Sequence, residues 1–303
     1  MKIIRKIFDK FRRQYIIPNR LDAIQEALGR IESRLNSSRQ SVDPRDHEFK
    51  VYSQWGEDGI IDYLCQTISI PVKSFVEFGV EDYTEANTLF LLKHRNWRGL
   101  VIDGSITNIE SIRCGTVFWR YDLQACVSFI TRDNINDIIT QHGLSGELGL
   151  LSVDIDGNDY WVWEAINCVR PAIVVCEYNS LFGPVANIST PYKADFFRTT
   201  EHASNMYYGA SISALNHLAE SRGYRLVAGN SAGNNVFFVR EDLLGPLRVQ
   251  TPEQAYVRAG FREARSRENC AELLTFESRQ QAIGGLLVVQ VDTGQHMSLK
   301  DAL

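Results

Sequence analysis

Several features that mark common protein classes are missing from this sequence of 303 residues. No apolar run approaches the roughly 20 residues that a membrane-spanning helix needs, and no stretch has the pattern of a signal peptide. The six cysteines form no CxxC pair and do not cluster with histidine, which argues against a structural zinc site and against a disulfide framework. These absences favour a globular protein of the cytoplasm.

An excess of positive charge is missing too. The formal net charge is -5, although residues 1–13 carry six basic side chains against one aspartate. The rest of the chain is therefore distinctly acidic, and the phosphates of DNA and RNA repel an acidic surface. We expect no nucleic-acid partner for the main domain.

Residues 1–13 interleave basic and apolar side chains. On a helix, Ile4, Ile7, Phe8 and Phe11 lie on one face, with the basic residues largely around it. This pattern is typical of an interfacial helix that is attracted to anionic lipid. The sequence therefore predicts contact with an anionic membrane surface, which would place a cytoplasmic protein at the inner membrane face. A solvated, partly frayed tail is the alternative.

Residues 17–35 have apolar side chains spaced alternately by four and by three, which is the seam of a coiled coil. These side chains are Ile17, Leu21, Ile24, Leu28, Ile31 and Leu35. The repeat is shorter than three heptads, so two interpretations stay open: a short coiled coil that joins two chains as a homodimer, or an amphipathic helix packed on its own domain. A polar linker with Pro44 follows, so residues 1–46 form a first segment.

Residues 47–242 alternate short apolar runs with helical patterns. The expected strands are 74–79, 99–103, 117–122, 148–154, 172–177, 224–228 and 236–240. This alternation favours an α/β fold with a mostly parallel sheet. A short Gly/Asn turn joins the last two strands, so they must be antiparallel to each other. Residues 243–303, with a helical stretch at 252–274 and a strand at 285–291, are assigned to a C-terminal extension whose sequence indicates no role.

Acidic residues end several of the expected strands. Glu77, Asp103, Asp154 and Glu177 stand at four such ends, and Asp122 ends the expected third strand. In open α/β sheets the ligand crevice lies beyond the carboxyl ends of the strands. A single acid there is often only a helix N-cap. The joint pattern favours a binding site.

The loop after the first expected strand has too few glycines to hold a pyrophosphate. Gly79 is followed by Glu81 and Asp82, whose charges would repel a phosphate at a helix N-terminus. A ligand with cationic groups and a ribose, such as S-adenosylmethionine, fits better. Asp103 is then placed to accept hydrogen bonds from both ribose hydroxyls, and Asp122 to accept one from the adenine amino group.

Five segments together resemble a class I S-adenosylmethionine-dependent methyltransferase of the FkbM-like group, which acts in surface-polysaccharide and natural-product pathways. They are "FVEFGVEDYTEANT", "GLVIDGS", "LLSVDIDGNDYWVWEAI", "IVVCEYN" and the reversed last hairpin, and the resemblance covers residues 52–240. It implies a Rossmann-like sheet, mostly parallel with the last hairpin reversed, to which the N-terminal helix and the C-terminal extension are added. The first loop departs from the group, because Glu81 and Tyr83 occupy later glycine positions.

The resemblance also implies roles for individual residues. Glu77 and Gly79 would line the methionine part of the cofactor, Asp103 would take the ribose, and Asp122 would lie by the adenine. Asp154 would face both the methyl donor and the acceptor. The acceptor would be a hydroxyl of a saccharide, of a lipid-linked saccharide or of a natural product.

Transfer of a methyl group to a hydroxyl needs a base, or a metal that lowers the pKa of the hydroxyl. The candidate bases are Asp154, Glu177 and His202, and His202 lies in an aromatic insertion at 178–209 that we expect to form the acceptor pocket. Alternatively, the acids at 154 and 177 hold a divalent cation. Asp156 is a further candidate for a direct role in the site, whereas we expect Asp159 to cap the following helix.

Two other functions remain open on the sequence alone. One is a nucleotide-binding oxidoreductase, which the missing phosphate loop and the terminal hairpin disfavour. The other is a catalytically silent assembly protein on the same fold, whose function would reside in the first segment and the extension.

Overall fold

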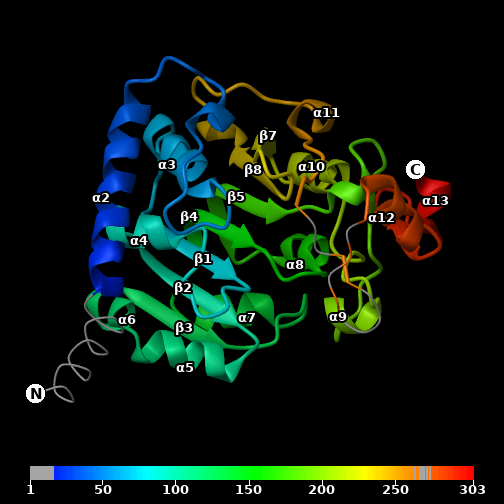
Figure 1. Cartoon of the computed structure of the whole chain (residues 1–303), viewed down its shortest axis with the longest axis horizontal. Helices are drawn as coiled ribbons and strands as arrows, with labels where there is room; N and C mark the ends of the chain where they lie inside the picture. The colour runs from blue at the N-terminus through cyan, green and yellow to red at the C-terminus, as the bar shows by residue number, and fades with distance from the viewer. Residues whose placement is uncertain (1–16, 262–263, 266–269, 271, 273) are drawn as a thin grey trace, which may run out of the picture.

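The computed structural model describes residues 17–261, 264–265, 270, 272 and 274–303, and its centre is a seven-stranded sheet (Figure 1). The strand order is β3-β2-β1-β4-β5-β8-β7. The strands are β1 Ser74–Phe78, β2 Arg98–Asp103, β3 Leu123–Val127, β4 Gly146–Val153, β5 Val169–Glu177, β7 Tyr224–Gly229 and β8 Asn235–Arg240. Strands β1 to β5 are parallel, and β8 is antiparallel to both β5 and β7. The predicted Rossmann-like sheet with a reversed last hairpin is confirmed.

One predicted strand is wrong. Val117 lies in a short helix, α6 Thr116–Arg120, and the third strand comes after it as β3. The segment has the apolar and aromatic residues of a strand, but Trp119 is 68% exposed, so the segment is not buried on both faces as a central strand must be. Asp122 therefore precedes β3 instead of ending it.

Helices cover both faces of the sheet and bury the inward-facing side chains of its strands. One face carries α3 Glu57–Thr67, α4 Leu89–Arg95 and α5 Ile106–Cys114. The other face carries α7 Ile135–Gln141, α8 Asp159–Ala165 and α10 Ile212–Ser221. Successive β1 residues alternate between these cores, with Phe75 on the first face and Val76 on the second. Both faces are closed by helices, so the free edge at the strand ends is where a ligand has access.

Helix α2 Ile17–Ser37 lies along the outside of the domain (Figure 1) and packs on it with a face of small and polar residues. Gly29 permits the close approach, because a Cβ at this position would lie 2.4 Å from Val51 Cγ2. Nearby, Asn36 Nδ2 donates to the carbonyl of His47 at 2.7 Å. The helix does pack on its own domain, as one of the two interpretations predicts, but its apolar row does not take part.

The insertion after β5 and the C-terminal extension fold together. Strand β6 Ile188–Ser189 of the insertion pairs with β9 Leu287–Gln290, which pairs in turn with β10 Gln295–Ser298. One hydrophobic core joins the insertion and the extension. Its buried side chains are Leu181, Phe182, Ile188, Phe196, Met206, Tyr207, Tyr208, Ala264, Ile283, Val288 and Leu299. The remaining helices of this region are α9 Arg198–Glu201, α11 Pro252–Ala255, α12 Phe276–Ile283 and α13 Leu299–Ala302. The strand predicted at 285–291 is confirmed by β9.

The helix predicted across 252–274 is not continuous, because α11 ends at Ala255 and residues 256–261 are not helical. The predicted membrane contact of residues 1–13 falls outside the described residues. In the part of the chain that the structure describes, no helix combines the length and the apolar character needed to cross a membrane.

Candidate active site

A cleft of about 690 Å³ opens at the carboxyl ends of the parallel strands. Loops that follow β1, β2, β3 and β4 form one wall, and the insertion forms the other. Its lining residues are Gly79, Glu81, Ile102, Asp103, Gly104, Ser105, Asn108, Ser128, Phe129, Ile130, Asp154, Ile155, Asp156, Asn158, Phe196, Phe197, Arg198, Thr199, Asn205 and Arg265. The predicted crevice thus exists at the predicted edge of the sheet.

The first loop takes an unusual backbone course without the usual glycines. Gly79 has φ +64°, and a Cβ there would lie 2.0 Å from the carbonyl oxygen of Asp154, so only glycine fits between β1 and β4. Glu81 and Tyr83 also have positive φ, at 48° and 61°. At these two positions, non-glycine residues adopt the left-handed backbone conformation that glycine usually adopts. This conformation costs backbone strain.

Glu77 lies beneath this loop, and its carboxylate is turned away from the cleft. Oε1 accepts from the amide of Asn87 at 2.7 Å, and Oε2 accepts from the amide and the hydroxyl of Thr88. Burial raises the pKa of Glu77 to about 7, against these hydrogen bonds, which lower it. Glu77 is not among the residues that line the cleft, so the structure places it as a support for the loop.

Asp103 lies in the cleft at the end of β2 and is held by three N–H donors. Oδ1 accepts from Ser105 N at 2.7 Å and from Asn108 Nδ2 at 3.1 Å, and Oδ2 accepts from Glu81 N at 2.9 Å. A carboxylate has about four lone-pair sites, so one remains for a ligand hydroxyl. Its orientation is fixed before any ligand arrives.

Asp122 lies at the opposite edge of the sheet from Asp103, which corrects its predicted place by the adenine. Its carbonyl accepts from the amide of Gly99, near the start of β2. The residues that do follow β3 in the cleft are Ser128 and Phe129, and the Phe129 ring is 46% exposed. Sequence reasoning missed both because the third strand was placed too early; an exposed phenylalanine at a strand end is the signal that could have found them.

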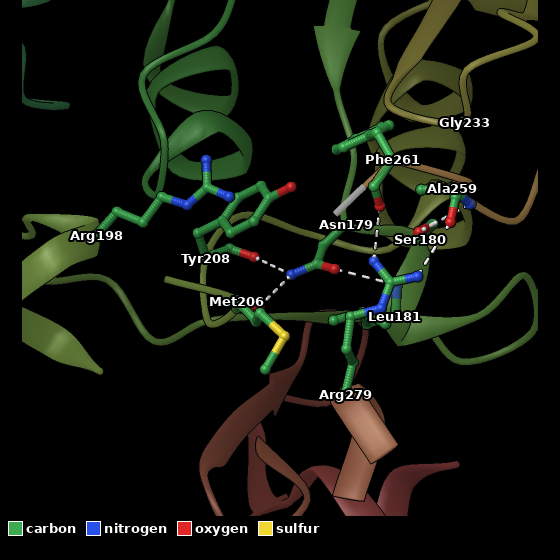
Figure 2. Close-up of a pocket in the computed structure, with 10 residues that line it drawn as sticks. All are labelled: Asn179, Ser180, Leu181, Arg198, Met206, Tyr208, Gly233, Ala259, Phe261 and Arg279. Atoms are coloured by element: carbon green, nitrogen blue, oxygen red, sulfur yellow. Dashed lines mark hydrogen bonds between the residues drawn. The ribbon is translucent and has the colours of Figure 1, made fainter. Parts of the chain in front are cut away.

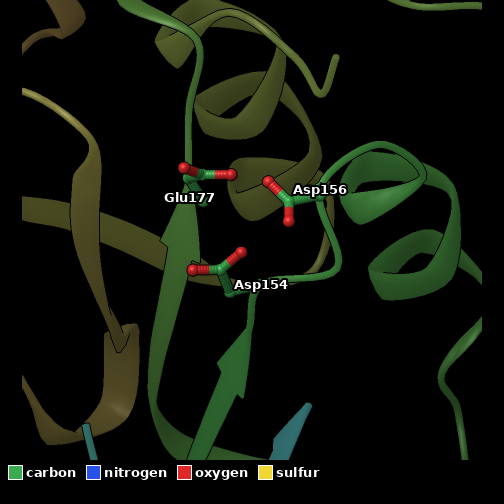
Figure 3. Close-up of side chains that lie close together, drawn as sticks. All are labelled: Asp154, Asp156 and Glu177. Atoms are coloured by element: carbon green, nitrogen blue, oxygen red, sulfur yellow. The ribbon is translucent and has the colours of Figure 1, made fainter. Parts of the chain in front are cut away.

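Three carboxylates meet at the ends of β4 and β5 (Figure 3). Asp154, Asp156 and Glu177 each offer an oxygen, and these oxygens lie within 4.8 Å of one another. Asp156 reaches the group from a backbone position with φ +55°. The sequence predicted Asp154 and Glu177 at this place. Asp156 joins them because the backbone turns back toward the sheet at this residue.

The carboxylates of this group repel one another and are largely shielded from water. Burial raises the pKa of Asp154 and of Glu177 well above the usual range, and the neighbouring carboxylates add to the effect. Glu177 is 7% exposed, and its Oε2 has no hydrogen-bond partner. Two such acids can share one proton. They are therefore suited to accept a proton from a ligand or to bind a cation.

Arg198 brings the neighbouring positive charge from the insertion. Its Nη1 lies 2.5 Å from Asp156 Oδ1, and its Nε donates to the carbonyl of Asn205 at 2.6 Å. The guanidinium also lies over the ring of Tyr208, 3.8 Å from its centroid. Its charge lowers the pKa of Asp154 and Glu177 and so opposes the effect of burial. Nothing in the local sequence pattern indicated this residue.

Two further predicted residues have structural contacts. His202 follows α9, where its Nδ1 lies 2.7 Å from the Ser204 hydroxyl, and it is not among the residues that line the cleft. Asp159, predicted as a helix cap, accepts from the amides of Ile155 and Gly157 at 2.8 and 2.9 Å. Asp159 thereby holds the loop that carries Asp156.

The acid group also has the chemistry of a site for a hard divalent cation. Carboxylate oxygens are the ligands such cations prefer, and the unpartnered Oε2 of Glu177 is suited to this role. Arg198 competes with it, because its guanidinium already lies on Asp156. The residues present therefore fit a cation, with Arg198 as the alternative source of positive charge.

A second, much smaller cavity of about 20 Å³ lies between the insertion and the extension (Figure 2). Asn179 Nδ2 donates there to the carbonyls of Met206 and Tyr208, and Arg279 donates to the carbonyls of Ala259 and Phe261. These hydrogen bonds join residues distant in sequence. The cavity has room for little more than one water molecule, so it is part of the packing between the two segments.

No protein-family model matches the sequence, and no curated protein matches it. Among solved structures, one that is similar is the N-terminal domain of EvdMO1 with SAH bound, at 10% identity and a TM-score of 0.39, covering 66% of this chain and 81% of that chain. Another is the O-methyltransferase from Bacillus cereus in complex with SAH, at 13% identity and a TM-score of 0.40, covering 77% of this chain and 95% of that chain. At such identities the likeness concerns the course of the chain and not individual side chains.

Proposed function

We propose that this chain is an S-adenosylmethionine-dependent O-methyltransferase. The observation that carries the proposal is the division of one cleft into two chemically different halves. One half holds Asp103 in a fixed orientation beside an exposed aromatic ring, which suits a nucleoside. The other half holds Asp154 and Asp156, and the buried Glu177 lies against them without lining the cleft itself. This crowded acid group suits the removal of a proton from an acceptor, so the cleft can hold a nucleoside donor beside a hydroxyl acceptor.

In the nucleoside half, Asp103 would bind a ribose hydroxyl and Phe129 would stack on the base. Gly79 allows the backbone of the first loop to lie close to Asp154, so the donor's amino-acid part would bind between these strand ends. The first loop carries Glu81 and Asp82 in place of a glycine-rich phosphate-binding loop, and their charges disfavour the pyrophosphate of a dinucleotide. When bound, the cofactor supplies an electrophilic methyl group.

In the acidic half, the residues of the chain position the acceptor and remove its proton. A hydroxyl that hydrogen-bonds to Asp154 meets a carboxylate whose raised pKa makes it a stronger base than a free one, and the buried Glu177 beside it contributes to that raised basicity as a neighbouring acid. The proton is left on the shared acid pair, and Arg198 balances the remaining charge. The insertion forms one wall of the cleft and so would cover one side of the acceptor.

The acceptor is proposed to be a saccharide hydroxyl, as in the FkbM-like group, free or linked to lipid. Phe197 is 56% exposed in the cleft wall and offers a face on which a sugar ring can stack. Polar groups of Thr199 and Asn205 lie in the same wall, and Asn158 lies in the opposite wall. Aromatic faces beside hydrogen-bonding groups are complementary to a polyol that has one apolar face.

Titration calorimetry separates this proposal from its two rivals. We expect the purified chain to bind S-adenosylmethionine and its demethylated product SAH, and not NAD or NADP. Binding of NAD in place of S-adenosylmethionine would favour the oxidoreductase, and binding of neither would favour the silent assembly protein. Release of SAH on addition of sugar nucleotides or lipid-linked saccharides then tests the acceptor class.

A further inference from the structure

The apolar row of α2 is exposed along its length. Leu21, Ile24, Leu28, Ile31 and Leu35 are 50–58% exposed. The opposite row of Gly29, Ser33 and Asn36 is buried on the domain. A surface helix normally buries its apolar stripe and exposes its polar one. In α2 this order is reversed, and no described part of the chain covers the apolar row.

The spacing of the row defines what can cover it. Leu21, Leu28 and Leu35 occupy one seam position of the heptad, and Ile24 and Ile31 occupy the other. Such a row packs knobs-into-holes against another helix with the same repeat. The next longest described helix of this chain, α3, has 11 residues and is already buried on the sheet. The α2 helix of a second copy carries the required repeat by definition.

Flanking charges decide between the two orientations of such a pair. In a parallel pair, residue Arg20 faces Gln25 of the second copy, and Ala27 faces its Glu32, so no like charges meet within the helix. In an antiparallel pair, Arg20 faces Arg34 of the second copy at both ends. Like charges in such flanking positions are destabilising. The charges favour the parallel arrangement.

We propose that α2 is a self-association surface, through which two copies of this chain pair as a parallel coiled coil. The domains sit on the outer faces of the coil, because Gly29, Ser33 and Asn36 face away from the apolar row. Leucine at the first seam position and isoleucine at the second shift the preference from two helices toward three or four, so the same row also supports assembly of more than two copies. The inference is independent of the methyl-transfer proposal.

The first experiment measures the mass of the full chain by sedimentation velocity from about 1 to 100 μM, because association depends on concentration. We expect a mass of two or more chains. Leu28→Glu places a charge in the seam and should weaken association by about 100-fold or more. Ala23→Glu adds the same charge at an exposed position of α2 outside the row, and should change association by less than about twofold. Leu28 is exposed, so both variants should melt at the wild-type temperature.

The second experiment tests orientation. Leu21→Cys should form a covalent dimer under mild oxidation beyond the level of the wild type, because only a parallel pair brings the two copies of this residue within about 7 Å. Oxidised dimer at the wild-type level overturns the parallel pair. A chain that stays monomeric throughout the concentration range, or associates only when anionic vesicles are added, overturns self-association through α2.

Discussion

The two halves of the cleft treat their carboxylates in opposite ways. Asp103 accepts three hydrogen bonds from N–H donors. Glu177 is as deeply buried, yet its Oε2 has no hydrogen-bond partner. Both residues end a parallel strand at the same edge of one sheet. The difference arises from the loops around each acid, since the loops after β1 and β2 each turn one amide toward Asp103, whereas the segment after β5 leads away into the insertion.

This difference indicates which acid binds and which one reacts. A carboxylate held by several N–H donors keeps its orientation, so its remaining lone pair can accept a hydrogen bond from a neutral hydroxyl. A buried carboxylate without partners is held at a high free energy when charged, and gains most from a proton or a cation. Binding specificity and chemical reactivity would therefore come from different strands of one sheet, and the number of N–H donors around each carboxylate would decide between them.

The largest expected effect comes from neutralising the reactive half. Asp154→Asn or Glu177→Gln should lower turnover by about 100-fold or more, because a general base typically contributes that much. Affinity for S-adenosylmethionine in calorimetry should change little. Asp195→Asn, which removes an exposed acid of the insertion, is the control and should leave turnover unchanged. Equal losses of turnover and affinity in the Asp154 variant would place that residue in the cofactor pocket.

The next largest effect concerns the binding half. Asp103→Ala should reduce affinity for S-adenosylmethionine by about 10- to 100-fold, since hydrogen bonds to a charged group contribute about 1.5–3 kcal/mol. Asp122→Ala is the matched control from the other edge of the sheet, and calorimetry should find less than about a twofold change. A larger loss for Asp122 than for Asp103 would contradict the placement of both residues.

Removal of Arg198 should have an intermediate effect and shift the pH profile. Its charge lowers the pKa of Asp154 and Glu177, so Arg198→Met should raise both pKa values. Turnover should then fall by about tenfold at neutral pH and recover partly at alkaline pH, as the acids lose their proton. EDTA should change wild-type turnover less than about twofold, because Arg198 supplies the positive charge. Loss of activity in EDTA, restored by Mg²⁺, would instead assign a metal to the acid group.

The smallest effect is on stability, and its sign follows from the raised pKa of Glu177. A group with a raised folded-state pKa stabilises the fold below its unfolded pKa, and this contribution is lost as the pH rises through the folded pKa. Glu177→Gln removes the buried charge, so it should raise the melting temperature by about 2 °C or more at pH 8 and by less at pH 5. A melting temperature that falls more at pH 8 than at pH 5 would show that the charged form is stabilised in the fold.

The sequence was sufficient to predict the sheet and three acids at its edge because these depend on local patterns. Short apolar runs marked the strands, and Asp103, Asp154 and Glu177 follow directly from strand ends. Asp122 was misplaced because the apolar run 117–120 is a helix whose aromatic side chain is exposed. An apolar run of this length does not by itself distinguish a strand from a helix.

The acceptor side was less predictable because it depends on contacts between distant segments. Arg198 reaches the acids only because the insertion folds on the extension, whose strand β9 is about a hundred residues away in sequence. No periodic pattern in the insertion indicates that pairing. The same holds for α2, where the repeat was evident but the choice of buried face depends on Gly29 and its contact with Val51.

The pairing of β6 with β9 also has a consequence for the order in which the protein is made. When residue 240 has left the ribosome, all seven strands of the main sheet are present, together with Asp103 and the three acids of the cleft. The core beneath the insertion still lacks Ile283, Val288 and Leu299. Contacts between segments so far apart form late in folding. A nascent chain would thus acquire its cofactor half first and an ordered acceptor wall last, which delays activity until synthesis has passed the extension.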